Sequence, residues 1–455
     1  MKGLNYECKR HHVSNRQKTI NKVAKDTKFI KRERDLTGFD FLVLMIFGLI
    51  SLKVPSLGGL VDVIKVKISR EALHKRFTCE AVAFLKQVLI SIQRTCIEQR
   101  IDSKFLDIFS KVIICDSTWW EIKEKLQHLF RGFGGDSPKA QCKLQLVYDF
   151  LIGQIDSTAI VEGVRNDATY SQTLLKRLTK GTLLLIDLGY FSVKFFEKIH
   201  NKGAYFISRL KSSTRMFHPS TLKEINLLKV LKNIQSDRFE ANILLGLHVN
   251  LSVPCRLIGF KVPKEVAQKR RRKYKVRKGV KMNPKEITLK LCDWTLMITN
   301  IPSDLLPAEK VYDFYRIRWQ IEIMFKQFKS ILQLNKINTG NEHRLLCEVY
   351  GKLIAAVIIS RIHSKLNIEL WNKKKREVSI EKFFKRIQER AFTIIILLQS
   401  SFKEAIKFME KTIKKCFGNC LKLIQRSRLS SLERLNSHCL HKFERIKPCQ
   451  LFTLS

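Results

Sequence analysis

Three short runs of apolar residues in the middle of the chain have the length expected of buried strands. They cover residues 112–115, 144–150 and 182–186. Strands this apolar are usually covered on both faces, as in α/β sheets. Stretches with helical periodicity follow the second and third runs, at residues 170–178 and 193–202. The pattern therefore predicts an α/β arrangement for this region.

The amino-terminal part of the chain has a helical pattern. Residues 41–52 form the longest apolar run; because twelve residues are too few to cross a bilayer, we expect a buried helix there. Ser69 is a candidate cap for a helix that begins after it. The helix, break, helix order is compatible with a helix-turn-helix. The basic residues of 10–34 predict a mobile or DNA-contacting arm.

The region of residues 215–300 differs from both. Short strands are expected at residues 256–262 and 287–299, on either side of a very basic loop at 269–275. This loop is either a phosphate-contacting segment or a solvated surface loop. After Pro307 the pattern is helical nearly to the end of the chain.

The net charge of the chain indicates the kind of partner that it binds. Lys and Arg number 85 against 41 Asp and Glu, a formal net charge of +44. Such an excess indicates a polyanionic partner. Nucleic acid is favoured over a membrane surface because the basic residues are spread along the whole chain, which suggests a long DNA footprint.

The cysteines and the amino terminus indicate the compartment. Residues 1–20 are polar and basic without an apolar core, so no secretory signal is expected. A cytoplasmic protein with reduced thiols follows. Zinc ligation is conceivable at one cluster, but its spacing fits no standard finger, and buried or incidental thiols are favoured. The cluster consists of Cys416, Cys420, His438, Cys439 and His441.

Three carboxylates stand where a metal site can form. Asp116 and Asp187 each follow an apolar strand, and Glu322 lies on a helix expected to start near Ala308. Carboxylates at strand ends and on a packed helix suit Mg²⁺, with Mn²⁺ as an alternative. Two such ions activate an attacking water or 3′-hydroxyl and stabilise the leaving oxygen of a phosphodiester. Taken singly, either Asp is weak evidence, and a role in a turn or a helix cap is favoured for it.

The helix around Glu322 carries an unusual polar face. On one continuous helix Tyr315, Arg318, Glu322 and Lys329 fall within an arc of about 60°. A charged solvent face would explain the Glu and Lys but not the Tyr and Arg in register with them. The adjoining apolar face consists of Ile317, Ile321, Met324, Phe325 and Phe328.

These residue types suggest separate roles. Glu322 would bind metal, and Arg318 and Lys329 would hold DNA phosphates, one by a planar fork and the other as a point charge. Tyr315 would donate its hydroxyl to a phosphate.

The same residues resemble the DDE transposases of the insertion-sequence-four group, whose signature is Tyr-x2-Arg-x3-Glu-x6-Lys, found here at 315–329. Asp116 stands before Ser and Thr, and Asp187 stands in Asp-x-Gly-Tyr, as in that group. Asp156 has the same local context as Asp116, but the strand before Asp116 is longer and more apolar. The resemblance covers roughly residues 36–360.

The resemblance implies an α/β fold with a ribonuclease-H-like core, a β-rich insertion, and helical regions at both ends. The predicted domains are a basic helical DNA-binding region at residues 1–105, the catalytic core at 106–214 and 303–365, the insertion at 215–302 and a helical region at 366–455. It also implies a bacterial, nucleoid-associated protein that acts as a homodimer on double-stranded DNA, at terminal inverted repeats and at a target.

Further DNA contacts follow from the resemblance and the charge pattern. Trp294 either stacks on a flipped base, as an insertion tryptophan does in the group, or belongs to the core. Trp119, Trp120 and Trp319 are expected to be structural. Leu188 stands where some members of the group carry a basic residue. The basic candidates are Arg209, Lys211, Arg270, Arg271 and Arg272.

Three hypotheses follow. The leading one is a Mg²⁺-dependent cut-and-paste transposase with Asp116, Asp187 and Glu322 as metal ligands. The second is a decayed or repurposed transposase that binds DNA without catalysis. The third is a ribonuclease-H-like nuclease that cleaves without strand transfer.

Overall fold

The computed structural model describes residues 17–32, 35–52, 55–95, 99–277, 286–423 and 429–436. These fold into two compact units. Unit 1 comprises Met1–Asp102, Ser117–Arg165 and Gln320–Ile424, and unit 2 comprises Ser103–Asp116, Asn166–Trp319 and Gln425–Ser455. Helices and a large sheet together make the fold mixed α/β, as the apolar pattern predicted.

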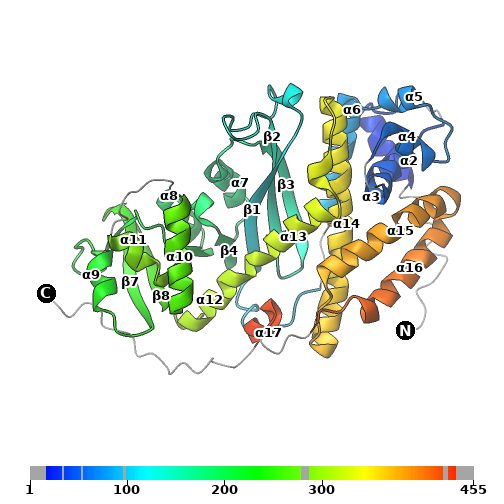
Figure 1. Ribbon diagram of the computed structural model, residues 1–455. Helices are drawn as coiled ribbons and strands as arrows, with labels where there is room; N and C mark the ends of the chain where they lie inside the picture. Colours follow the sequence, from blue (N-terminus) through cyan, green and yellow to red (C-terminus); the bar gives the residue numbers. More distant parts are fainter. Residues whose placement is uncertain are drawn as a thin grey trace. The chain divides into compact units, whose positions relative to one another are not determined.

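The described residues contain one nine-stranded sheet, in the order β3-β2-β1-β4-β5-β9-β8-β7-β6 (Figure 1). Strand β1 passes from unit 2 into unit 1 after Asp116. The pairs β1–β4 and β4–β5 are parallel, whereas β2–β3 and the pairs from β5 to β6 are antiparallel. The strands are β1 Lys111–Glu121, β2 Gln141–Asp149, β3 Gln154–Glu162, β4 Thr182–Ile186, β5 Tyr205–Arg209, β6 Arg215–Phe217, β7 Arg238–His248, β8 Leu251–Lys261 and β9 Trp294–Thr299.

Helices account for most of the remaining described residues. In unit 1 they are α2 Gly38–Val43, the π-helical turn Leu44–Gly48, α3 Leu49–Ser51, α4 Leu57–Asp62, α5 Arg70–His74, α6 Cys79–Arg94, α14 Glu342–Lys374, α15 Ile380–Ser400 and α16 Phe402–Asn419. In unit 2 they are α7 Ser171–Leu175, α8 Val193–Asn201, α9 Leu227–Asn233, α10 Lys264–Arg277, α11 Glu286–Leu291, α12 Ala308–Ile317 and α17 Ser431–Asn436. Helix α13, Trp319–Ser330, begins at the last residue of this part of unit 2 and continues in unit 1.

Strand β1 extends further than its apolar run predicted. The prediction ended the strand before Asp116, whereas β1 continues to Glu121. The residues after Asp116 include Thr118, Trp119 and Trp120, which favour strands, and from Thr118 on burial alternates along the strand. Asp116 is therefore a strand residue, not a turn residue. The prediction for 182–186 is confirmed by β4.

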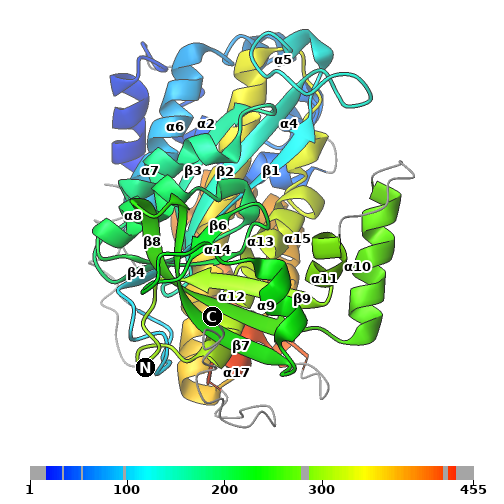
Figure 2. The ribbon, with the colours of Figure 1, turned by 90° about the vertical axis from the view of Figure 1, so that its left-hand side faces the viewer.

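The region of residues 215–302 contains strands, as predicted, but two of its segments were predicted wrongly. Residues 269–275, expected as a loop, lie in α10, and residues 287–291, expected as strand, lie in α11 (Figure 2). Lys, Arg, Gln and Ala are good helix formers, which explains the helical state of α10. Strand β9 pairs with β5 through Ile207 and Thr299, so the strands of this region extend the same sheet.

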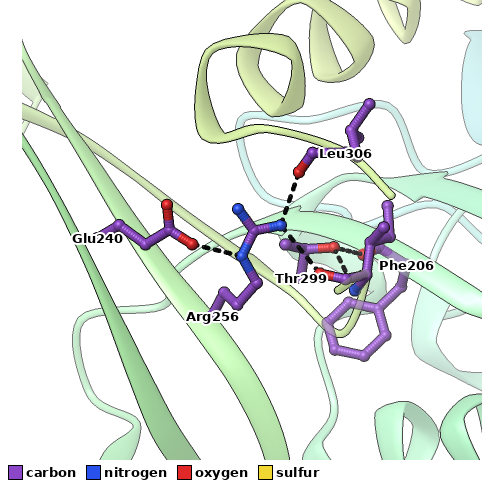
Figure 3. A network of polar contacts seen from close by, with 6 residues as sticks. Phe206, Glu240, Arg256, Thr299 and Leu306 are labelled. Carbon is purple, nitrogen blue, oxygen red and sulfur yellow. Dashed lines mark hydrogen bonds and ion pairs between the residues drawn. The ribbon is translucent and has the colours of Figure 1, made fainter. Parts of the chain in front are cut away.

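A buried polar network in unit 2 holds the segment that leads into α12 (Figure 3). Arg256 is 5% exposed; it pairs with Glu240 at 2.5 Å and donates through Nη1 to the carbonyls of Ile301 and Leu306 at 2.9 Å each. Thr299 Oγ1 donates to the Phe206 carbonyl at 2.7 Å, which ties the end of β9 to β5. Since a buried arginine must be paired, this network fixes where α12 starts relative to the sheet.

The helix expected over residues 315–329 is divided at Arg318. Helix α12 ends at Ile317, and the Arg318 N–H bonds to the carbonyl of Tyr315 at 3.1 Å, three residues back. Such a bond tightens the last turn of a helix. The Arg318 backbone itself stays helical, with φ −49° and ψ −31°. Tyr315 and Arg318 belong to unit 2, and Glu322 and Lys329 to α13 in unit 1.

Unit 1 is built around α14, with α6 beside it (Figure 1). Gly351 of α14 lies against the π-helical turn, where an added Cβ would come within 2.4 Å of the Met45 carbonyl oxygen. Only glycine permits that close approach. The helix predicted for residues 41–52 is confirmed as a buried segment, and Ser69 caps α5 by accepting from the Ala72 N–H at 3.1 Å.

Two of the sequence predictions fall partly outside the described residues. Within the basic arm at 10–34, residues 17–26 are helical, and residues 10–16 are not described. In the cysteine cluster, Cys416 and Cys420 are buried thiols, while His438, Cys439 and His441 lie outside the description. None of the described helices is long and apolar enough to cross a membrane.

A buried amine in α14 makes the stability of unit 1 depend on pH. Lys352 is 1% exposed and donates to the Gln333 carbonyl at 2.8 Å; its neighbour Glu348 pairs with Arg344 at 2.7 Å. Burial lowers the pKa of Lys352 from 10.5 to about 8. Between these two values the unfolded chain binds a proton that the folded chain releases, so stability contributed at this position increases with pH.

We therefore expect the free energy of unfolding, relative to a Lys352→Met variant, to increase by on the order of 3 kcal/mol from pH 8 to pH 10.5. Denaturant unfolding of both proteins across this range measures the difference. If the free energy of unfolding changed with pH in the same way in both proteins, the Lys352 amine would not be desolvated in the folded chain.

Candidate active site

Asp116 and Asp187 lie next to each other on two parallel strands. The last registered pair of β1 and β4 is Cys115 with Ile186, and the two aspartates directly follow that pair. The backbone of Asp187 is still extended, with φ −86° and ψ 169°, and a 3-10 turn of Leu188–Tyr190 begins after it. Adjacent parallel strands therefore present two carboxylates at one edge, where open α/β sheets build their sites.

Each of these carboxylates has a partner from the carboxyl end of α12. Arg318 Nη1 donates to Asp116 Oδ2 at 2.8 Å, and their side chains are 14% and 19% exposed. The Tyr315 hydroxyl donates to Asp187 Oδ1 at 3.4 Å. The Arg318 guanidinium also lies 5.8 Å from the centre of the Tyr315 ring. One cation and one hydroxyl thus meet the two carboxylates within unit 2.

The state of Tyr315 follows from its surroundings. The side chain is 8% exposed, and burial raises its pKa to about 12, a rise that the Arg318 charge opposes. The hydroxyl is therefore protonated at neutral pH and acts as a donor.

A buried layer lies behind the two aspartates. The Tyr190 hydroxyl is hydrogen-bonded with the Cys115 thiol; burial raises the pKa of both groups, and the nearby charges of Asp116 and Asp167 add to the rise. Asp167 Oδ2 is also 3.4 Å from the position that a Cβ on Gly189 would occupy. Sequence reasoning assigned no role to Tyr190 or Asp167. Tyr190 could have been found in the Asp-x-Gly-Tyr context, but Asp167 follows no apolar strand.

Glu322 and Lys329 lie on α13 in unit 1. Glu322 is half-buried, and Lys329 donates through Nζ to the Trp119 carbonyl at 2.9 Å. Burial lowers the pKa of Lys329. Of the tryptophans expected to be structural, only Trp120 is buried, whereas Trp119 and Trp319 are 48% and 56% exposed. Trp119 is exposed because burial alternates along this part of β1. Trp319 is exposed at the first residue of α13.

The basic candidates of unit 2 fall into two groups. Arg270 is anchored to the Trp294 carbonyl and to Thr295 Oγ1, both at 2.9 Å, and Arg271 is paired with Asp293. Arg209, Lys211 and Arg272 are exposed. Burial lowers the pKa of Arg270, and the charge of Arg209 lowers it further. The same charge opposes the rise that burial causes in the pKa of Tyr315. Arg209 is therefore the basic candidate that the structure brings near the aspartate pair.

Trp294 belongs to the core in this structure. It is 3% exposed and packs edge-on against Phe239, with ring centres 5.3 Å apart at 70°. Stacking on a base stays a prediction, and it requires the ring to leave this packing.

The donor set of the aspartate pair suits a divalent cation. Two carboxylates are hard oxygen ligands, and Arg318 already places a positive charge against one of them. Within the described ranges, no group of three or more His, Cys, Asp or Glu side chains is assembled as a metal site. Asp156 lies in β3, away from the β1–β4 register, so the register favours Asp116 as the partner of Asp187.

The comparisons with known proteins agree with this chemistry. A family model described as "Transposase DDE domain" matches residues 107–358, a segment that includes both aspartates and the whole of 315–329. The transposase for insertion sequence element IS231F of Bacillus thuringiensis subsp. israelensis is 30% identical over 406 residues, covering 84% of this chain and 85% of that protein. The transposase for insertion sequence element IS1151 of Clostridium perfringens is 29% identical over 446 residues, covering 89% and 93%.

A cryo-EM structure of a piggyBac transposase synaptic complex with hairpin DNA is similar at a TM-score of 0.46 and 11% identity, covering 92% of this chain and 86% of that one. Similarity at that level does not establish the fold. The family match spans more than half of the chain, and the relatives match along most of its length. The chain belongs to the family of transposases with a DDE domain, enzymes that catalyse DNA cleavage and strand transfer.

Proposed function

We propose that this transposase is a member of the insertion-sequence-four group in which Asp116, Asp187 and Glu322 hold the divalent metal ions. The placement of Asp116 and Asp187 on neighbouring parallel strands, each met by a signature residue, is the observation that carries the proposal. Transposases with a DDE domain generally use divalent metal ions. We propose Mg²⁺, with Mn²⁺ as an alternative, because the donors are carboxylates. When bound, the ions supply an activated water or 3′-hydroxyl and charge for the leaving oxygen.

The residues around the aspartates would position the DNA backbone. Arg318 offers a planar guanidinium that can bind two phosphate oxygens, and it neutralises Asp116 in the absence of DNA. Tyr315 stays protonated and can donate to a phosphate or to Asp187. Lys329 would add a point charge, and Arg209 and Lys211 would follow the backbone from the end of β5. Arg270 and Arg271 are tied to β9, so Arg272 is the stronger phosphate candidate of α10.

The finer architecture is part of the same proposal. A ribonuclease-H-like core would consist of β1 to β5 with their helices, and the β-rich insertion would supply β6 to β9. The partner is double-stranded DNA, at the terminal inverted repeats and at a target, and a homodimer would process the two ends together. The domain boundaries at residues 105, 214, 302 and 365 stay predictions, and the two compact units divide the chain differently.

The test is a strand-transfer assay with the purified chain. DNA that carries the element's terminal repeats, as found beside its coding region, is incubated with a supercoiled target plasmid and Mg²⁺. We expect 3′-ends to be cut and joined to the plasmid, and chelation by EDTA to abolish both steps while end binding persists.

The other outcomes separate the competing hypotheses. Cutting without joining would identify a nuclease, and end binding without metal-dependent nicking would identify a DNA-binding protein. Joining that continues at full rate in EDTA would refute the metal assignment.

A further inference from the structure

Helix α16 carries a lysine-rich face for which the active-site chemistry has no use. The face, here called the α16 lysine face, consists of Lys403, Lys407, Lys411, Lys414 and Lys415, and all five side chains are exposed. At about 100° per residue they fall within an arc of about 120°. Four of them, Lys407 and the three that follow it, line one shallow surface depression together with Glu410.

The opposite side of α16 is used for packing. Ala405, Thr412 and Cys416 are buried there, and the helix lies side by side with α15 (Figure 1). The lysine face is therefore held on a packed helix. From Lys403 to Lys415 it spans about 18 Å at 1.5 Å per residue. Because duplex DNA carries one charge per about 1.7 Å of axis, this length can reach several phosphates.

The charge of the helix is strongly one-sided. Against the five lysines, α16 contains two acidic residues, Glu404 and Glu410, and Glu404 pairs with Lys407 at 3.2 Å. A solvated helix face normally alternates the two signs so that neighbours at three and four residues neutralise each other. Here lysines follow that spacing at 403, 407, 411 and 415, and Glu404 and Glu410, on the same side of the helix, offset only part of their charge. Like charges at such spacing destabilise a helix, a cost that an anionic partner relieves.

We propose that the α16 lysine face binds the phosphate backbone of duplex DNA without reading its sequence. The inference rests on the proposed function, and adds a contact surface to it outside the residues of the candidate active site. Lysine is a point charge on a flexible stem, which suits phosphates along a variable path. Lysine can also reach guanine edges, but the face carries no Arg, Asn or Gln, and a flexible ammonium needs only a phosphate oxygen as its partner. It therefore contributes affinity and not specificity.

The test compares the salt dependence of DNA binding by the full chain and a variant with Lys407→Gln, Lys411→Gln, Lys414→Gln and Lys415→Gln. Fluorescence anisotropy is measured on two duplexes, one with the terminal repeat and one unrelated, from about 50 to 300 mM salt. Each phosphate contact contributes about 0.9 to the slope of log Kobs against log salt, so four contacts lower it by up to about 3.6. We expect a decrease between about 2 and 3.6 in the size of the slope on both duplexes, with their affinity ratio unchanged.

A second variant controls for net charge. It replaces four exposed lysines of unit 2, Lys176, Lys194, Lys198 and Lys202, by Gln. This control should leave the slope within about 0.5 of that of the parent chain, and circular dichroism verifies that both variants are folded. An equal decrease in the control would show that net charge alone acts, and would overturn the proposal.

Two further outcomes would also overturn the assignment. An unchanged slope in the α16 variant would show that another anion, such as an acidic protein, is the partner of this face. A loss confined to the terminal-repeat duplex would show that the face reads sequence. If the parent chain joins ends while the α16 variant keeps the full slope, only this inference fails; if the parent chain joins no ends, the proposed function fails.

Discussion

Replacing Asp116 by Asn is expected to reduce the rate of strand cleavage by at least about 10³-fold, whereas the same change at Asp156 should leave it within about twofold. Both residues precede Ser-Thr, but only Asp116 directly follows the Cys115–Ile186 pair, after which Asp187 also stands. A neutral amide is a poor ligand for a divalent cation, and losing about 4 kcal/mol of transition-state stabilisation corresponds to a 10³-fold slower step. Single-turnover cleavage of labelled terminal DNA in Mg²⁺ measures the rate.

The control must separate chemistry from folding, because Asp116→Asn removes the carboxylate charge that pairs with Arg318. Asp187→Asn serves this purpose, since the partner of Asp187 is the neutral Tyr315 hydroxyl. Both variants should lose cleavage, and the thermal midpoint of Asp187→Asn should change little. Cleavage that survives in Asp116→Asn and disappears in Asp156→Asn would move the site to the other Asp-Ser-Thr segment.

Replacing Glu322 by Gln is the second change with a large expected effect. We expect a loss of cleavage comparable to that of Asp116→Asn, with end binding retained to within a few fold, since the change keeps the size of a half-buried side chain on α13. The physical reason is that a third carboxylate completes a hard-oxygen site for the cation. Cleavage is measured as above, and binding by anisotropy in EDTA.

The matched control is Glu381→Gln, which removes the same charge from an exposed position in the first turn of α15. It should cleave like the parent chain. Undiminished cleavage by Glu322→Gln would refute the ligand assignment and direct attention to another carboxylate near the aspartate pair, of which Asp167 is the one that acts electrostatically on Cys115 and Tyr190.

Much of this protein follows from local properties of its sequence. The apolar run at 182–186 forms β4, and all five of its residues are buried. A short run of apolar and β-branched residues is the local pattern of a strand covered on both faces. Ser69 caps α5 through a hydrogen bond three residues away, which requires no tertiary contact. The two Asp contexts and the spacing at 315–329 are likewise sequence properties, and they predict a DDE transposase, which the family match confirms.

Other features depended on contacts between distant segments. Strand β1 continues beyond Asp116 because its neighbours bury alternate residues, and α10 is a helix whose Arg270 and Arg271 are held by β9. The loop prediction at 269–275 was wrong because the helix-forming Lys, Arg, Gln and Ala of this segment outweigh its dense charge.

The sequence by itself predicts which residues carry the chemistry: two strand-associated aspartates and a helical segment with Tyr, Arg, Glu and Lys. Only the tertiary structure decided how some of them meet, with Arg318 on Asp116 and Tyr315 on Asp187. Residues 116 and 318 are 202 positions apart, and no periodicity extends over such a separation. Their contact arises from the β1–β4 register and from the Arg256 network that fixes the start of α12.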